Sequence, residues 1–264
     1  MSVPNEGRIS TRSEGFLQVI TIDRPAKRNG FTPAMLRGYA QAITDFEADP
    51  QARCAVLHGE GPHTTAGLDL PAVSAAWDRG ETVYPPELHD IWDLRPPLRR
   101  KPLVMAVRGI TFTVGVELML TADLVVAGSD CRFAVLEVTR GIMASGGATI
   151  RLPQRAGWGN AMRFLLTGDE FGAAEACRLG LVQEVVPPEE ALERACTLAR
   201  RVAEGAAPLA VQATRENARL AQEQGAEAAR AAFDPTRNRL RATQDAREGL
   251  ASFVERRPPG FTGR

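Results

Sequence analysis

The chain has 264 residues, enough for one large domain or for one domain with a small appendage. Lysine and arginine together number 32, as do aspartate and glutamate, so the formal net charge is zero. This balance argues against a nucleic-acid-binding protein held by bulk electrostatics. Residues 1–10 contain no apolar segment, so we expect neither a secretion signal nor a membrane partner.

The cysteines predict reduced thiols and no metal site. They are scattered along the chain, with no CxxC pair and no histidine at ligand spacing: Cys54, Cys131, Cys177 and Cys196. Such an arrangement is typical of a cytoplasmic protein without bound metal.

Strands and helices alternate in the first part of the chain. Residues 16–22 predict a strand, and residues 54–58 predict a second, buried strand. Between them, Thr32 and Pro33 are a suitable cap and first position for a helix that runs to about Glu47. This alternation favours an α/β fold built from right-handed crossovers.

The same alternation continues through a strongly apolar stretch. Residues 103–107 predict a buried strand, residues 114–120 a buried helix, and residues 124–127 and 132–135 two further strands. Residues 81–102 contain five prolines and predict an irregular or helical excursion of the kind that lines a pocket.

The remainder of the chain is predicted to be mostly helical. The expected helices are residues 148–155, 160–166, 173–179, 188–204, 207–223 and 234–254, with a short strand over 182–186. Near residue 200 the composition shifts toward alanine, arginine, glutamate and glutamine. We therefore predict a core of residues 1–200 and a C-terminal helical subdomain of residues 201–264.

Two glutamates, Glu117 and Glu137, stand in apolar surroundings. Burying a carboxylate costs desolvation energy that packing alone does not require, so both are candidate functional residues. The alternative is a structural role in ion pairs with arginines such as Arg108 or Arg140.

Several other chemistries lack their motifs. Residues 144–147 do not have the spacing of a GxSxG elbow, no Walker sequence occurs, and residues 59–64 only half match a dinucleotide-binding turn. His58 ends an apolar strand and is expected to be a hydrogen-bonded core residue. His63, on a loop near the candidate site, is a possible substrate contact.

Two glycine-containing turns, each leading into a helix, remain alongside the two glutamates, and here the chain resembles the crotonase (enoyl-CoA hydratase/isomerase) superfamily. The matching blocks cover nearly the whole chain: residues 22–25 with 29–31, 65–70, 101–109 with 115–118, 123–127 with 133–137, and 173–182. The spacing across these blocks is more specific than any one of them. The resemblance implies a crotonase-like ββα spiral core with a C-terminal helical oligomerisation subdomain.

The resemblance also places two backbone N–H donors of an oxyanion hole on Leu68 and Val114. When a thioester carbonyl becomes an enolate, its oxygen gains negative charge, and each such donor is typically worth about 3 kcal/mol. Val114 also begins the helix that carries Glu117, where free N–H groups and the positive end of the helix dipole meet. The simpler alternative is two ordinary turns that enter helices.

The family's hydratases use one carboxylate to activate water for attack at C3 of a trans-2-enoyl thioester, and another to protonate C2. By resemblance, Glu117 is the expected base and Glu137 the expected acid, with at least one pKa raised by burial and like charge. The implied function is that of an enoyl-CoA hydratase. The alternatives are an enoyl-CoA isomerase that uses Glu137 alone, a catalytically silent acyl-CoA binder, and an RNA-binding relative, against which the zero net charge weighs.

Coenzyme A is implied as part of the substrate, with no prosthetic group. The residues expected along it are Ala26, Arg28, Ala66, Leu68, Leu70, Val114 and Gly115. Lys27, Arg28 and Arg256 are candidate partners of its phosphates. Because members of the family commonly form trimers that pair into hexamers, we expect a homo-oligomer.

The sequence departs from the family pattern at three points. Thr113-Val114-Gly115 stands where many relatives have three glycines, Arg108 replaces the usual asparagine, and Thr64-Thr65 replaces the common Phe-Ser. A β-branched residue at the donor position narrows the pocket and restricts the backbone. These changes bear on which acyl groups fit more than on the fold.

Overall fold

A computed structural model describes residues 6–82 and 84–264. Residues 1–5 of the predicted core and residue 83 of the proline-rich excursion lie outside the described residues. The α/β class expected from the sequence is confirmed.

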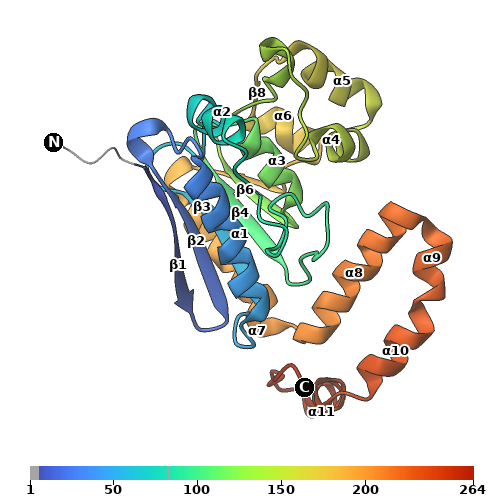
Figure 1. Ribbon diagram of the computed structural model, residues 1–264. Helices are drawn as coiled ribbons and strands as arrows, with labels where there is room; N and C mark the ends of the chain where they lie inside the picture. The colour runs from blue at the N-terminus through green and yellow to red at the C-terminus, as the bar shows by residue number, and fades with distance from the viewer. Residues whose placement is uncertain (1–5, 83) are drawn as a thin grey trace.

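A six-stranded sheet forms the centre of the fold (Figure 1). In spatial order its strands are β1 (Arg8–Glu14), β2 (Leu17–Asp23), β3 (Cys54–Gly59), β4 (Leu103–Val107), β6 (Leu124–Gly128) and β9 (Glu184–Val186). β1 pairs antiparallel with β2, and all the other neighbours are parallel. The parallel pairing places the carboxyl ends of β2, β3 and β4 at the same end of the sheet.

A second sheet contains β5 (Ile110–Phe112), β7 (Arg132–Ala134) and β8 (Phe171–Gly172). β5 pairs parallel with β7, and β7 pairs antiparallel with β8. The strands predicted from residues 16–22, 54–58, 103–107, 124–127 and 132–135 are confirmed. β1, β5 and β8 were not predicted, because β1 is largely polar and partly exposed and β5 and β8 have only three and two residues.

Helices cover both faces of the main sheet because successive strand residues point to opposite sides. Val19 and Val56 pack toward α7 (Ala191–Gly205), whereas Ile20 and Leu57 pack into the larger core on the other side. That larger core also receives α1 (Pro33–Ala48) and α3 (Val114–Thr121). In Figure 1, α1 lies in front of the sheet and α7 behind it.

Local sequence signals set several helix boundaries. The Thr32 side chain accepts a hydrogen bond from the Met35 N–H at 3.2 Å, so it caps α1 as predicted. The single helix predicted over 234–254 is wrong, because Thr243 caps a new helix by accepting from the Ala246 N–H at 3.1 Å. The helix expected from residue 188 begins at Ala191, after a 3-10 turn over Pro188–Glu190.

The other helices are α2 (Leu70–Asp78), α4 (Ala148–Ala156), α5 (Trp158–Thr167), α6 (Ala173–Arg178), α8 (Pro208–Gln224), α9 (Ala226–Ala231), α10 (Phe233–Arg241) and α11 (Gln244–Glu255). Helices α8 to α11 extend away from the sheet as an arm (Figure 1). Residue 200 lies within α7, so the arm itself begins after the boundary predicted from composition; the division into two domains stays a prediction. In the described part of the chain, no helix is both long and apolar enough to span a membrane.

Candidate active site

The candidate site lies at the carboxyl ends of β2, β3 and β4, where ligands commonly bind to parallel sheets. Asn29 connects two of the loops there. Its side-chain amide donates to the carbonyl oxygens of Glu60 and His63, both at 2.8 Å, and its Oδ1 accepts from the Arg24 N–H at 2.7 Å. The loop after β2 is therefore fixed against the loop after β3.

The first glycine turn, residues 65–70, is held from both sides. Phe31 donates its N–H to the Gly67 carbonyl at 2.8 Å and accepts from the Asp69 N–H at 2.8 Å. These two bonds flank Leu68, and its own N–H has no partner among the described residues. The turn then enters α2, whose first turn is capped by the Asp69 carboxylate.

The second turn leads from β5 into α3. Thr113 donates its N–H to the Ala134 carbonyl at 2.7 Å, and the Thr113 carbonyl accepts from the Glu117 N–H at 3.0 Å. Thr113 has φ +49° and ψ −108°, a conformation that costs a non-glycine residue on the order of 1–3 kcal/mol. The N–H of Val114, the first residue of α3, has no partner in the described part of the chain.

The two turns touch each other at the residues that precede the two free N–H groups. A Cβ on Gly67, whose φ is +109°, would collide with the Thr113 Oγ1. A Cβ on Gly115 would lie 2.7 Å from the Thr65 Cγ2. Backbone pairing between Thr65 and Thr111 fixes this junction, so the turns that carry Leu68 and Val114 are packed together.

Glu117 is a buried carboxylate held by backbone N–H groups. Its side chain projects from α3, and the residue is 3% exposed. The Oε1 atom accepts from the Gly146 N–H at 2.6 Å and from the Ala148 N–H, near the start of α4, at 3.3 Å. Burial raises the pKa of Glu117 to about 7, with a smaller raising effect of the Glu137 charge, against the lowering effect of these N–H groups.

Glu137 is the first residue of a 3-10 helix, Glu137–Arg140, that follows β7 and Leu136. Its Oε2 atom is buried and has no hydrogen-bond partner among the described residues. Burial raises the pKa of Glu137 as well. Neither glutamate forms an ion pair with an arginine anywhere in residues 6–82 and 84–264, and the only side-chain hydrogen bond of Arg140 goes to the Thr139 carbonyl.

The residues expected along coenzyme A fall on adjoining loops. Ala26 lies in the 3-10 helix Pro25–Lys27, and Arg28 follows it in the left-handed conformation. Ala66 donates its N–H to the Arg28 carbonyl at 2.8 Å, which brings the two loops into contact. Leu70, at the start of α2, is 41% exposed.

Gly115, the last residue expected along coenzyme A, is buried in the first turn of α3. Arg256 follows α11, next to the C-terminal tail, whose Phe261 carbonyl accepts from Arg53 at 2.9 Å. Arg53 precedes β3, at the opposite end of the sheet from Arg28. Within one chain, Arg256 therefore lies away from Lys27 and Arg28.

The two histidines of this region have structural contacts. His58 is buried, and its Nε2 lies 2.9 Å from the Thr21 Oγ1, as expected for a core histidine. The His63 Nδ1 accepts from the Ile110 N–H at 3.2 Å. Burial lowers the pKa of His58.

The sequence did not reveal what surrounds the Glu117 carboxylate. The Gly146 and Ala148 N–H groups come from a segment considered only for its mismatch to a serine elbow. Trp92 comes from the proline-rich excursion: a Cβ on Gly146 would lie 2.8 Å from the Trp92 Cδ2 and would collide with the Glu117 Oε2. Only the glycine pair at 146–147 before a helix could have signalled this contact.

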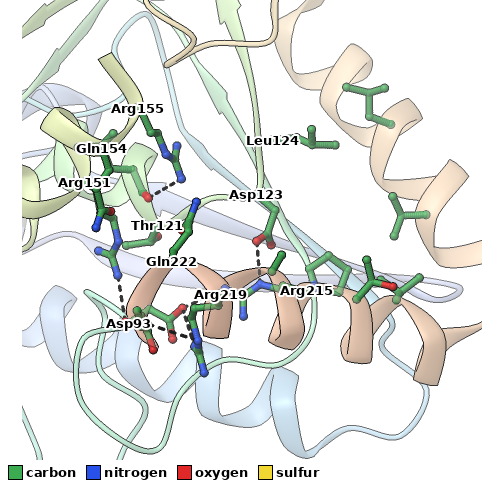
Figure 2. Close-up of a pocket in the computed structure, with 18 of the residues that line it drawn as sticks. Asp93, Thr121, Asp123, Leu124, Arg151, Gln154, Arg155, Arg215, Arg219 and Gln222 are labelled. Atoms are coloured by element: carbon green, nitrogen blue, oxygen red, sulfur yellow. Dashed lines mark hydrogen bonds and ion pairs between the residues drawn. The ribbon is translucent and has the colours of Figure 1, made fainter. Parts of the chain in front are cut away.

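A large groove lies elsewhere, between α8 and the core, with a volume of about 1140 Å³ (Figure 2). Its lining includes none of Glu117, Glu137, Leu68 and Val114. In residues 6–82 and 84–264, no group of three or more histidine, cysteine, aspartate or glutamate side chains is placed to hold a metal ion.

A family profile described as enoyl-CoA hydratase/isomerase matches residues 12–264. The chain belongs to this family. It is 34% identical over 252 residues to the 2,3-dehydroadipyl-CoA hydratase of Escherichia coli (strain K12), covering 93% of this chain and 95% of that protein. It is 33% identical over 254 residues to the enoyl-CoA hydratase EchA19 of Mycobacterium tuberculosis, covering 95% and 94% of the two chains.

Solved structures of this enoyl-CoA hydratase/isomerase family have the same fold. A probable enoyl-CoA hydratase/isomerase from Mycobacterium abscessus superposes with a TM-score of 0.93 at 46% identity, covering 97% of this chain and 98% of the other. An enoyl-CoA hydratase from Mycobacterium tuberculosis H37Rv gives 0.89 at 36% identity, with coverage of 97% and 99%. The crotonase-type fold inferred from the sequence is confirmed, including its C-terminal helices.

Proposed function

We propose that this member of the family is an enoyl-CoA hydratase, which adds water across the double bond of a trans-2-enoyl-CoA thioester. The observation that carries the proposal is the pair formed by the buried Glu117 and the half-buried Glu137, whose Oε2 atom is buried; neither side chain forms an ion pair in the described structure. The related proteins named as hydratases support the same reaction.

In the proposed mechanism, the thioester oxygen accepts hydrogen bonds from the N–H groups of Leu68 and Val114. Ionised Glu117 takes a proton from water as the water oxygen bonds to C3. The C2=C3 π electrons move toward the carbonyl, and the resulting enolate charge is stabilised by the two N–H groups. Protonated Glu137 then gives its proton to C2, which leaves Glu117 protonated and Glu137 ionised until they exchange protons with solvent.

Coenzyme A is proposed to run from the loop after β2 across the first turn. Ala26, Arg28 and Ala66 would lie beside its adenine and phosphates, because the Ala66–Arg28 hydrogen bond joins their loops. Leu68 and Leu70 would follow its pantetheine arm, with Val114 and Gly115 near the thioester. Lys27 and Arg28 supply positive charge on the same loop.

We also propose a homo-oligomer, a trimer or a hexamer, assembled through the C-terminal helices. Apolar side chains on α10 and α11 are largely exposed in the single chain: Phe233, Leu250, Phe253 and Val254. We propose a cytoplasmic location because the four cysteines carry no disulfide spacing.

Substitution of Glu117 by glutamine tests the reaction type. Glu117→Gln keeps the shape of the side chain but removes the base, so hydration of crotonyl-CoA should fall by about 10²–10⁴-fold. Isomerisation that depends on Glu137 alone would largely survive the same change. Glu193→Gln, at a side chain that is 78% exposed, is the matched control and should retain wild-type turnover.

A panel of enoyl-CoA thioesters of varying chain length and branching should accompany this comparison. Calorimetric binding of acyl-CoA without turnover of any member of the panel would contradict the proposal and would indicate a silent binder.

A further inference from the structure

Trp92, in the proline-rich excursion, forms a wall beside Glu117. It is 7% exposed, and its indole and the Glu117 carboxylate lie on either side of the space that a Cβ on Gly146 would occupy. The Tyr84 ring packs against it with 6.1 Å between the ring centroids. Because the described residues of this segment form no helix or strand, the position of Trp92 depends on contacts with neighbouring side chains.

One set of contacts comes from α4. Arg151 donates from Nη1 to the Trp92 carbonyl at 2.7 Å and from Nη2 to the Asp93 carbonyl at 3.0 Å. The same helix begins at Ala148, whose N–H reaches Glu117. Arg151 therefore fixes the Trp92 backbone to the element that holds the Glu117 carboxylate.

A second set comes from α8, on the C-terminal arm. Arg215 donates from Nη2 to the Asp93 Oδ2 at 2.9 Å, from Nε to the Asp123 Oδ1 at 2.7 Å, and from Nη1 to the Arg99 carbonyl. The Arg215 and Asp93 side chains are 14% and 8% exposed. Figure 2 shows Asp93 between Arg151 on one side and Arg215 and Arg219 of α8 on the other.

Asp93 is itself well fixed in the excursion. Its Oδ1 accepts from the Arg99 N–H at 2.8 Å, and Arg219 approaches its Oδ2 at 3.6 Å. Because its carboxylate is buried and bonded to α8, Asp93 is held in place relative to that helix, and so is the adjacent residue, Trp92. Charge-assisted hydrogen bonds of this kind are stronger than bonds between neutral groups, so they hold the geometry firmly.

We propose that Arg215 is a positioning residue for the active site: by holding Asp93, it keeps Trp92 against Glu117 and excludes water from that carboxylate. The effect on turnover rests on the proposed function, but the position of Trp92 does not. The arm of C-terminal helices thus contributes to the catalytic environment of its own chain, at a residue far from the reacting atoms.

The pKa of Glu117 depends on the exclusion of water by Trp92 and on the charged and titratable groups that face the carboxylate. These are Glu137 after β7, Arg151 of α4 and Tyr84 of the excursion. Because burial is the largest cause of the raised pKa of Glu117, a loosened Trp92 should lower that pKa.

The test uses Arg215→Met in a chain whose other tryptophans, Trp77 and Trp158, are replaced by phenylalanine. Both replaced side chains are exposed, so the fold should tolerate their loss. Trp92 is then the one tryptophan left, and the fluorescence reports on it alone. The emission of Trp92 should shift to longer wavelength, and its quenching by acrylamide should rise about twofold as water reaches the indole. This readout requires no turnover.

Turnover provides the second readout. The kcat/KM for hydration should fall about tenfold or more in Arg215→Met, because even a small displacement of catalytic groups lowers the rate of the reaction. The acidic limb of its pH profile should move to lower pH. Arg230→Met is the matched control, since Arg230 is 75% exposed and its partner Glu227 is 92% exposed; it should change none of these quantities.

If Arg215→Met does not fold, Arg215→Lys decides, because lysine keeps the charge but cannot reach all three partners at once. A folded Arg215 variant with the emission and quenching of the parent chain overturns the proposal. So does a folded variant that loses stability but keeps the acidic limb in place. If the parent chain hydrates no enoyl-CoA, the proposed function fails, and the Trp92 fluorescence still tests the positioning by Arg215.

Discussion

Two groups of carboxylates in this chain have opposite surroundings. Beneath α8, Asp123 accepts hydrogen bonds from Arg99 at 2.8 Å and from Arg215 at 2.7 Å. At the candidate active site, Glu117 and Glu137 have no cation bonded to them in the described structure. Burial acts to raise the pKa in both groups, so the difference lies in their partners.

The partners reverse the direction of the pKa shift. Burial alone would raise the pKa of Asp123, but Arg99 and Arg215 together lower it, so this carboxylate stays ionised and structural. Burial raises the pKa of Glu117 to about 7, because the opposing effects, two backbone N–H groups and the charge of Arg151, are weaker than the cost of burial. A carboxylate without a cation can therefore exchange its proton near neutral pH, as acid-base catalysis requires.

The largest effect is expected when Glu137, a carboxylate without an ion pair, is replaced by a neutral side chain. Glu137→Gln should lower hydration by about 10²–10⁴-fold, because the proton donor to C2 is lost. The free energy of unfolding should change by only about 1 kcal/mol, since no ion pair is broken. Steady-state assays and urea unfolding of the same preparation measure both quantities; a large loss of stability with intact turnover would reverse the roles assigned here.

The paired acid should behave in the opposite way. Asp123→Asn leaves the buried Arg99, whose side chain is 3% exposed, without its carboxylate, and should destabilise the fold by about 3 kcal/mol or more. Chemical unfolding monitored by circular dichroism gives the value. In the control Asp234→Asn, the ion pair with Arg237 is exposed, so the change should stay within about 0.5 kcal/mol. Equal stabilities of the two variants would show that the Arg99–Asp123 pair is not structural.

A smaller effect is expected from crowding the Glu117 carboxylate without removing it. Gly146→Ala places a methyl group between Glu117 and Trp92, so hydration should fall about tenfold as the carboxylate is displaced. Gly159→Ala is the control, because nothing lies within 4 Å of that added atom and α5 should be slightly stabilised. Turnover of both variants, normalised to folded protein, checks this; equal activities would mean that Gly146 does not confine Glu117.

The sequence predicted those features that depend on local patterns. The Thr32-Pro33 helix start, the buried strands and the helix that carries Glu117 follow from capping and apolar periodicity, and the structure has all of them. The break at Thr243 was missed because the pattern of residues 234–254 continues through it. Short strands such as β5 have too few residues to show a period.

The environment of the site was harder to predict than its position. Glu117 was picked out because a charged residue in an apolar run is conspicuous. Its partners, Gly146 and Ala148, lie 29 and 31 residues away and use only backbone atoms, so their side chains carry no signal. Trp92 belongs to a segment whose described residues form no helix or strand, and the tertiary contacts of Trp92 and Asp93 fix it.

The pH dependence of kcat/KM for crotonyl-CoA hydration by the wild-type protein tests the central claim most directly. Glu117 must be ionised to take a proton from water, so the rate should rise with pH through an acidic limb with an apparent pKa near 7. In Glu117→Gln that limb should disappear along with most of the activity. A rate that is flat from about pH 5 to pH 8, or an equal limb in the glutamine variant, would contradict the account.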